Sequence, residues 1–195
     1  FDRAIELDND YKWAIASRGE TYQLMQRYEE ALADFDRAIE LDNDYKWAIA
    51  SRGEIYLLLH QYGRALADFN TAIDIEANDW RYYGRALAYL SLRDKENAKA
   101  NLTQAIQLAQ QDYQKDASNY RNTLNLALYF LVACKLDRAK HFYQDALSQR
   151  PSTFLISEAI QDLQDLLTIF PNYPSAEEIQ IFLQRQLQEL EKLSR

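Results

Sequence analysis

Small and apolar residues recur three and four positions apart along most of the chain, which is the spacing of one face of an α-helix. Residues 12–25 carry one such stripe and residues 29–41 carry a second. So few residues separate the two stripes that the helices must turn back on each other as an antiparallel hairpin. The pattern therefore predicts an all-α protein built from helical hairpins. Residues on the facing sides of the first hairpin are Ile15, Gly19, Tyr22, Ala31, Phe35 and Ala38.

The hairpin is repeated along the chain. Residues 1–20 recur unchanged as residues 35–54, and the 34-residue units 1–34 and 35–68 differ at seven positions. A third, diverged copy follows 33 residues later and a fourth follows after a longer gap. A repeat of this length predicts stacked hairpins that share one continuous core. The interior positions return as Gly53, Tyr56, Ala65, Phe69 and Ala72, then Ala86, Tyr89, Ala98, Leu102 and Ala105, then Ala127, Phe130, Ala139, Tyr143 and Ala146.

These four sets of small and aromatic residues resemble the tetratricopeptide repeat family over about residues 1–148. The resemblance implies a right-handed superhelical solenoid of about eleven helices, with the first helix of each hairpin on its concave side. We expect one array with the following divisions: a half repeat 1–11, repeats 12–45, 46–78, 79–117 and 118–150, and a degenerate repeat with a capping helix 151–195. The third repeat has a longer second helix, and helices are expected at 153–169 and 175–193, the last with Glu and Gln outside.

Two polar features of the repeat have structural interpretations. Asp42, Asn43 and Asp44 are expected to end one helix and cap the next. Arginine precedes the small residue of the first helix, and a guanidinium on a packed face needs a partner. Acidic residues recur in step on the second helix, so we predict the ion pairs Arg18–Asp34 and Arg52–Asp68.

A second face of each first helix is expected to remain open to a ligand. All three tryptophans of the chain fall on it, one in each of three successive repeats, and tryptophan is frequent among residues that dominate binding energies. The alternative is that each indole packs against the neighbouring repeat, near Tyr11 or Tyr45. The predicted ligand-binding residues are Trp13, Ala16, Glu20, Gln23, Trp47, Ala50, Glu54, Leu57, Trp80, Tyr83 and Leu87.

The glutamates on this face favour a protein or peptide with apolar anchors and basic flanks. In the resembled family, one well-known groove clamps a peptide carboxylate with Lys, Asn and Arg. The matching positions here hold Ala16, Ser17 and Glu20, so that clamp is not expected. The net charge of −8 argues against nucleic acid or an anionic membrane as a partner. The single cysteine favours a reducing, cytoplasmic location.

Catalysis, cofactors and a metal are not expected. The four glycines are isolated, the histidines His60 and His141 lack ligand spacing, and Cys134 ends an apolar run that predicts a core position. The leading hypothesis is a protein-binding scaffold. Near-identical repeats also resemble C-terminal arrays of large bacterial multidomain regulatory proteins, which implies a sensor or autoinhibitory arm that contacts upstream domains, for example of a nucleotide-switch ATPase. We accordingly expect the C-terminal portion of a longer protein. Self-association through Phe1, Ala4 and Ile5 is a third hypothesis.

Overall fold

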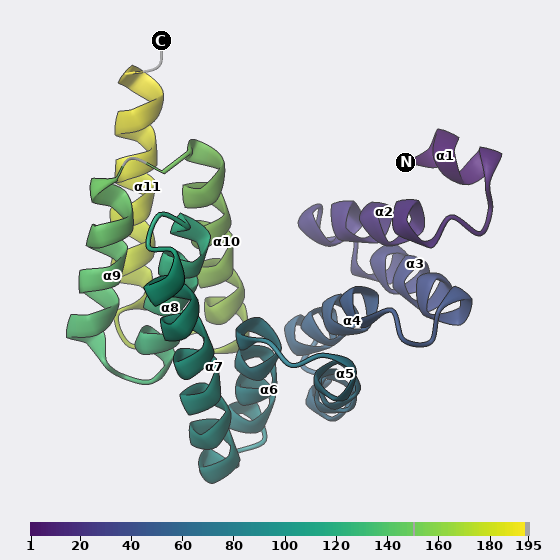
Figure 1. Cartoon of the computed structure of the whole chain (residues 1–195), viewed down its shortest axis with the longest axis horizontal. Coiled ribbons are helices and arrows are strands. Elements are labelled where there is room, and N and C mark those ends of the chain that lie inside the picture. The colour runs from purple at the N-terminus through teal and green to yellow at the C-terminus, as the bar shows by residue number, and fades with distance from the viewer. Residues whose placement is uncertain (150, 194–195) are drawn as a thin grey trace. The chain divides into compact units, whose positions relative to one another are not determined.

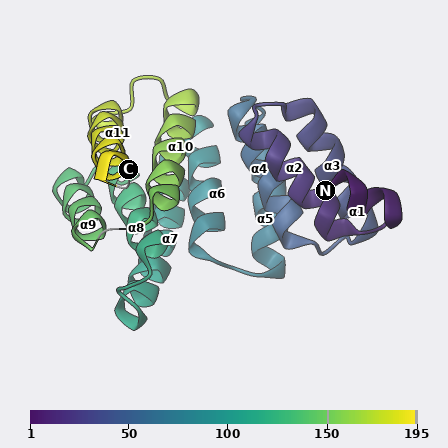
Figure 2. The ribbon, with the colours of Figure 1, turned by 90° about the horizontal axis from the view of Figure 1, so that it is seen from above.

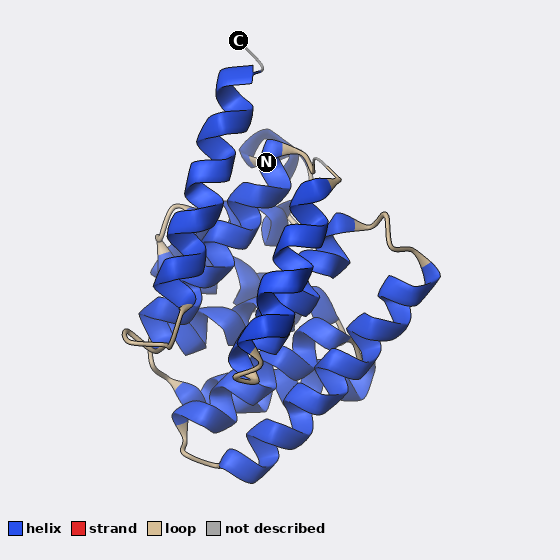
Figure 3. Cartoon of the chain, turned by 90° about the vertical axis from the view of Figure 1, so that its left-hand side faces the viewer, coloured by secondary structure: helices blue, strands red, loops and turns tan. Residues whose placement is uncertain are grey.

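The computed structural model describes residues 1–149 and 151–193. These residues form eleven α-helices and no strand (Figure 3), which confirms the all-α fold class. The chain divides into two compact units, Phe1–Ala98 and Lys99–Arg195, and we describe each by itself. The helices are α1 Asp2–Leu7, α2 Lys12–Leu24, α3 Tyr28–Leu41, α4 Lys46–Leu58, α5 Tyr62–Ile75, α6 Asp79–Ser91, α7 Lys95–Lys115, α8 Tyr120–Val132, α9 Leu136–Ser148, α10 Thr153–Ile169 and α11 Ala176–Leu193 (Figure 1).

The predicted helix boundaries agree with the structure to within about three residues. The hairpin expected at 46–75 is α4 followed by α5, and the helix expected at 153–169 is α10. The lengthened second helix of the third repeat is α7, which has 21 residues where α3 and α5 have 14.

Each hairpin turn contains one residue with a left-handed backbone. The residues are Gln26, His60, Arg93 and Cys134, with φ between 55° and 64°. A residue in this conformation directly after a helix lets the following N–H groups bond back to the last free carbonyls of that helix. The core position predicted for Cys134 is therefore wrong. Its side chain is exposed, because the apolar run ends with α8 and Cys134 belongs to the turn that follows.

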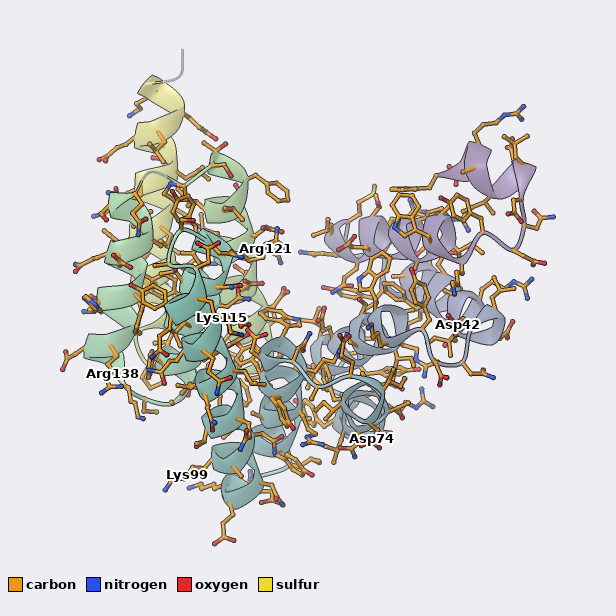
Figure 4. All side chains as sticks on the ribbon, in the orientation of Figure 1. Asp42, Asp74, Lys99, Lys115, Arg121 and Arg138 are labelled. Carbon is orange, nitrogen blue, oxygen red and sulfur yellow. The ribbon has the colours of Figure 1, made fainter. Side chains whose placement is uncertain are left out.

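The connection between repeats also differs from expectation. Asp42 ends α3 as predicted, and its side chain accepts a hydrogen bond from the backbone N–H of Asp44 at 3.1 Å (Figure 4). It does not cap the next helix. The N-cap residue of α4 in the described chain is Tyr45, whose side chain makes no capping hydrogen bond. The acidic loop thus folds on itself before α4 begins.

The first unit is built around buried phenylalanines of the second helices. Phe35 on α3 and Phe69 on α5 are fully buried. A Cβ atom at Gly53 on α4 would lie 3.3 Å from the ring of Phe69, and a Cβ atom at Gly84 on α6 would lie 2.4 Å from the same ring. The ring of Phe69 therefore contacts the first helix of its own hairpin and the first helix of the next one.

The second unit pairs α8 with α9 and α10 with α11 as two hairpins, and α8 also contacts α10 (Figure 2). The ring of Phe130 on α8 stacks on Phe142 of α9, with centroids 5.4 Å apart. Tyr173, in the loop before α11, donates a hydrogen bond to the carbonyl of Val132 at 2.8 Å, which joins the two hairpins. The outer surface of α11 is less polar than predicted, because Ile181 and Phe182 are exposed on it.

Gly84→Ala should lower the free energy of unfolding by about 1–3 kcal/mol, because its methyl group overlaps the ring of Phe69. Gly63→Ala is the matched control. In the described part of the chain no heavy atom lies within 4 Å of a Cβ at this exposed helical glycine. That substitution should stabilise the protein by about 0.5–1 kcal/mol. Urea unfolding of both variants measures the difference, and equal effects would show that the approach at Gly84 is not close.

Asp165 on α10 should make stability depend on pH. Burial raises the pKa of its carboxyl to about 6 from an ordinary value of 3.8, although Gln161 donates a hydrogen bond to it at 2.8 Å. The folded state thus binds this proton more tightly than the unfolded chain does. The contribution to stability grows as pH falls from about 7 and is complete near pH 4.

Asp165→Asn should remove this contribution and raise the free energy of unfolding at pH 7 by about 1–3 kcal/mol. The parent protein and the variant are compared by urea unfolding from pH 4 to 7.5. The two curves should converge at the acid end, and parallel curves would refute a raised pKa at Asp165.

Candidate ligand-binding face

The first helices of the first unit, α2, α4 and α6, lie next to one another, because α4 contacts both of the others. Trp13, Trp47 and Trp80 each occupy the second residue of their helix. Glu20 and Glu54 stand seven residues after the first two tryptophans, which places them on the same side of α2 and α4 as the indoles. We call the surface formed by Trp13, Gln23, Glu20, Trp47, Glu54 and Trp80 the first-helix face.

The three indoles differ in their surroundings. Trp13 is 51% exposed, with the rings of Phe1 and Tyr11 each 5.9 Å away. Trp47 is half-buried and packs against the core cluster that joins the first two hairpins. Trp80 is half-buried, with the ring of Tyr83 at 5.3 Å. Packing is thus a large part of the role of Trp47 and Trp80, whereas Trp13 presents most of an indole to solvent.

A glutamate links the three first helices. Glu54 on α4 accepts a hydrogen bond from the amide of Gln23 on α2 at 3.3 Å, and its other oxygen accepts one from the indole N–H of Trp80 on α6. This link fixes the indole orientation at Trp80. Sequence reasoning placed all three residues on one face without predicting that they bond to one another.

Five of the predicted ligand-binding residues are buried, so their assignment is corrected. The sequence argument considered only the packing inside a hairpin, but each first helix also packs on the next first helix. Ala16, for example, belongs to one buried cluster with Ala48 and Ile55 of α4. A ligand on the surface does not reach these side chains. The buried five are Ala16, Ala50, Leu57, Tyr83 and Leu87.

The tetratricopeptide repeat model matches residues 12–45 and again residues 81–112. The chain carries tetratricopeptide repeats. Both matches cover a first helix of the first-helix face together with residues of the helix that follows it. Comparison with curated protein sequences gives no match.

Solved structures share the repeat fold. A thermophilic protein of this repeat type from Thermus thermophilus, TTC0263, is 18% identical with a TM-score of 0.57, over 88% of this chain and 98% of that one. A tetratricopeptide repeat protein from Parabacteroides merdae is 15% identical with a TM-score of 0.56, over 96% and 75%. YrrB, described as a repeat protein with an unusual peptide-binding site, is 19% identical with a TM-score of 0.54, over 92% and 96%. At these identities the likeness shows the fold.

Arginine clasps hold each tetratricopeptide hairpin together beside the face. Both predicted ion pairs are present. Arg52 on α4 bonds both oxygens of Asp68 at 2.8 and 2.7 Å, and Arg18 bonds both oxygens of Asp34 at the same two distances. These carboxylates raise the pKa of both guanidinium groups, so the arginines remain charged.

Each arginine also has a partner on the preceding second helix, which the sequence argument missed. Arg18 bonds Asp2 on α1 at 2.9 Å and Arg52 bonds Asp36 on α3 at 2.7 Å. In the third repeat Arg85 donates to Asn70 on α5 at 2.9 Å. The acceptors stand 34 residues apart, and that period was the available signal.

A lysine at the start of each first helix adds a further contact. Lys12 pairs with Asp42 at the end of α3, and Lys46 pairs with Glu76 at the end of α5. The described residues hold no cluster of His, Cys, Asp and Glu suited to a metal ion. None of the helices among them combines the length and the apolar character needed to cross a membrane.

Arg52→Leu should lower the free energy of unfolding by about 3 kcal/mol, because it leaves the carboxylate of Asp68 buried without its cation. Adding Asp68→Leu should recover part of the loss, since the pair is then replaced by apolar groups. Lys115→Ala, which breaks an exposed pair on α7, is the control and should leave the unfolding midpoint unchanged. A double variant less stable than Arg52→Leu alone would contradict this account.

Proposed function

We propose that the protein is an interaction scaffold whose first-helix face binds a peptide or an extended segment of a partner protein. One observation carries this proposal most directly: Trp13 exposes about half of its surface on the side of α2 that also carries Glu20. An indole buries a large area at a small cost in side-chain entropy, which makes an exposed one a strong anchor for a ligand.

The charge of the face supports a basic partner. Glu20 is exposed and Glu54 is half-buried, and neither position has a cation in the adjoining turns of its own helix except the arginines held by Asp34 and Asp68. A lysine or arginine of the ligand meets carboxylates here and also the faces of the indoles. An apolar side chain next to that basic residue packs against Trp13.

A randomised peptide library displayed on phage and panned against the full chain tests the proposal. The enriched peptides should combine a large apolar residue with a neighbouring lysine or arginine. Trp13→Ala should weaken their binding by about tenfold or more, measured by calorimetry with synthetic peptides. Glu20→Gln should weaken it less and should reduce its dependence on salt.

Phe154→Ala is the matched control, because Phe154 is an exposed aromatic residue on α10 of the other unit. It should leave the affinities unchanged. Enrichment of acidic peptides, or affinities that Phe154→Ala lowers as much as Trp13→Ala does, would refute the proposed site.

A further inference from the structure

The duplicated sequence contains its own control for what covers α1. Residues 1–20 and residues 35–54 are identical, and in the structure each is followed by a further hairpin. The copies differ in what precedes them: a loop and the α2–α3 hairpin, within residues 8–34, pack on the second copy. A difference in burial between equivalent residues therefore reports what a preceding hairpin covers.

That difference is large on the apolar side of α1. Phe35 is fully buried, whereas the equivalent Phe1 is 52% exposed. Ala38 is buried and Ala4 is half-buried. Leu41 is half-buried and packs on the core, whereas Leu7 is 73% exposed. The same residues that form an interior in the second copy thus form an open apolar surface in the first.

Specific contacts within the covered copy define what the open surface fits. A Cβ atom at Gly19 would lie 3.2 Å from the ring of Phe35, so the covering helix needs a glycine there. Asp10 pairs with Arg37 at 2.9 Å. Lys12 pairs with Asp42. The positions in the first copy that correspond to Phe35, Arg37 and Asp42 are Phe1, Arg3 and Asp8.

Two of these contacts recur one repeat later, which shows that they belong to the repeat itself. Gly53 approaches Phe69 in the same way, and Lys46 pairs with Glu76. The covering element is therefore described by three residues in fixed order: an aspartate in the loop, a lysine two positions later, and a glycine seven positions after the lysine.

We propose that the open side of α1, formed by Phe1, Arg3, Ala4 and Asp8, is a docking surface for a helical hairpin with the residue pattern of 8–34, carried by another polypeptide chain. A second copy of this chain does not offer that hairpin, because its residues 8–34 are already packed on its residues 35–54. This surface is separate from the first-helix face, and the inference does not depend on the proposed function.

A fluorescein-labelled synthetic peptide with the sequence of residues 8–34 tests the inference by anisotropy against the full chain. It should bind in a saturable manner, and Phe1→Ala in the chain should weaken binding by at least about tenfold, since Phe1 is the central apolar contact. Phe154→Ala should have no effect. A peptide bearing Gly19→Leu should not bind, although leucine favours the helix, because its side chain occupies the place of the Phe1 ring.

Charge reversal gives a second readout that packing alone does not move. Arg3→Asp in the chain should weaken binding of the parent peptide, and Asp10→Arg in the peptide should restore it. Failure of the parent peptide to bind, binding that Phe1→Ala leaves unchanged, or a dimer of the chain that Phe1→Ala dissociates in analytical ultracentrifugation would each overturn the inference.

Discussion

Contact between a phenylalanine ring and glycine positions on two first helices determines how the hairpins of the first unit stack. Phe69 is fully buried, and its ring lies within 3.3 Å of a Cβ site on α4 and within 2.4 Å of one on α6. A larger residue at either position would separate the helices. Because the close approach occurs on both sides of one ring, α4 and α6 lie next to each other, and the surface residues of the two helices form one face.

Polar contacts then fix the register of that stacking. Each clasp arginine binds the second helix of its own hairpin and the one before it, as Arg52 does with Asp68 and Asp36. A sliding motion of one hairpin past another would break these bonds and leave a nearly buried carboxylate unpaired. Glu54 adds a link between first helices on the exposed side. The candidate binding face is in this way held from behind by the clasps and along its surface by Glu54.

Much of this could be predicted from the sequence, because the determining contacts repeat every 34 residues. Helical spacing located the hairpins, and the alternation of Arg18 and Asp34 with Arg52 and Asp68 identified two ion pairs. Contacts between repeats were harder to predict. The burial of Ala16 and Ala50 depends on how first helices pack on each other, and periodicity within one helix does not contain that information. The turn position of Cys134 was missed for a related reason, since an apolar run does not show which residue leaves the helix.

The central claim, that the Phe69 ring sets the spacing of the hairpins, is tested most directly by a double-mutant cycle between Gly84→Ala and Phe69→Leu, measured by urea unfolding. Leucine is the residue that the chain itself has at the corresponding position 102, so it preserves an apolar core while removing the ring. The account predicts that alanine at position 84 is tolerated in the leucine background, with a coupling free energy of about 1 kcal/mol or more. Strictly additive effects of the two substitutions would contradict it.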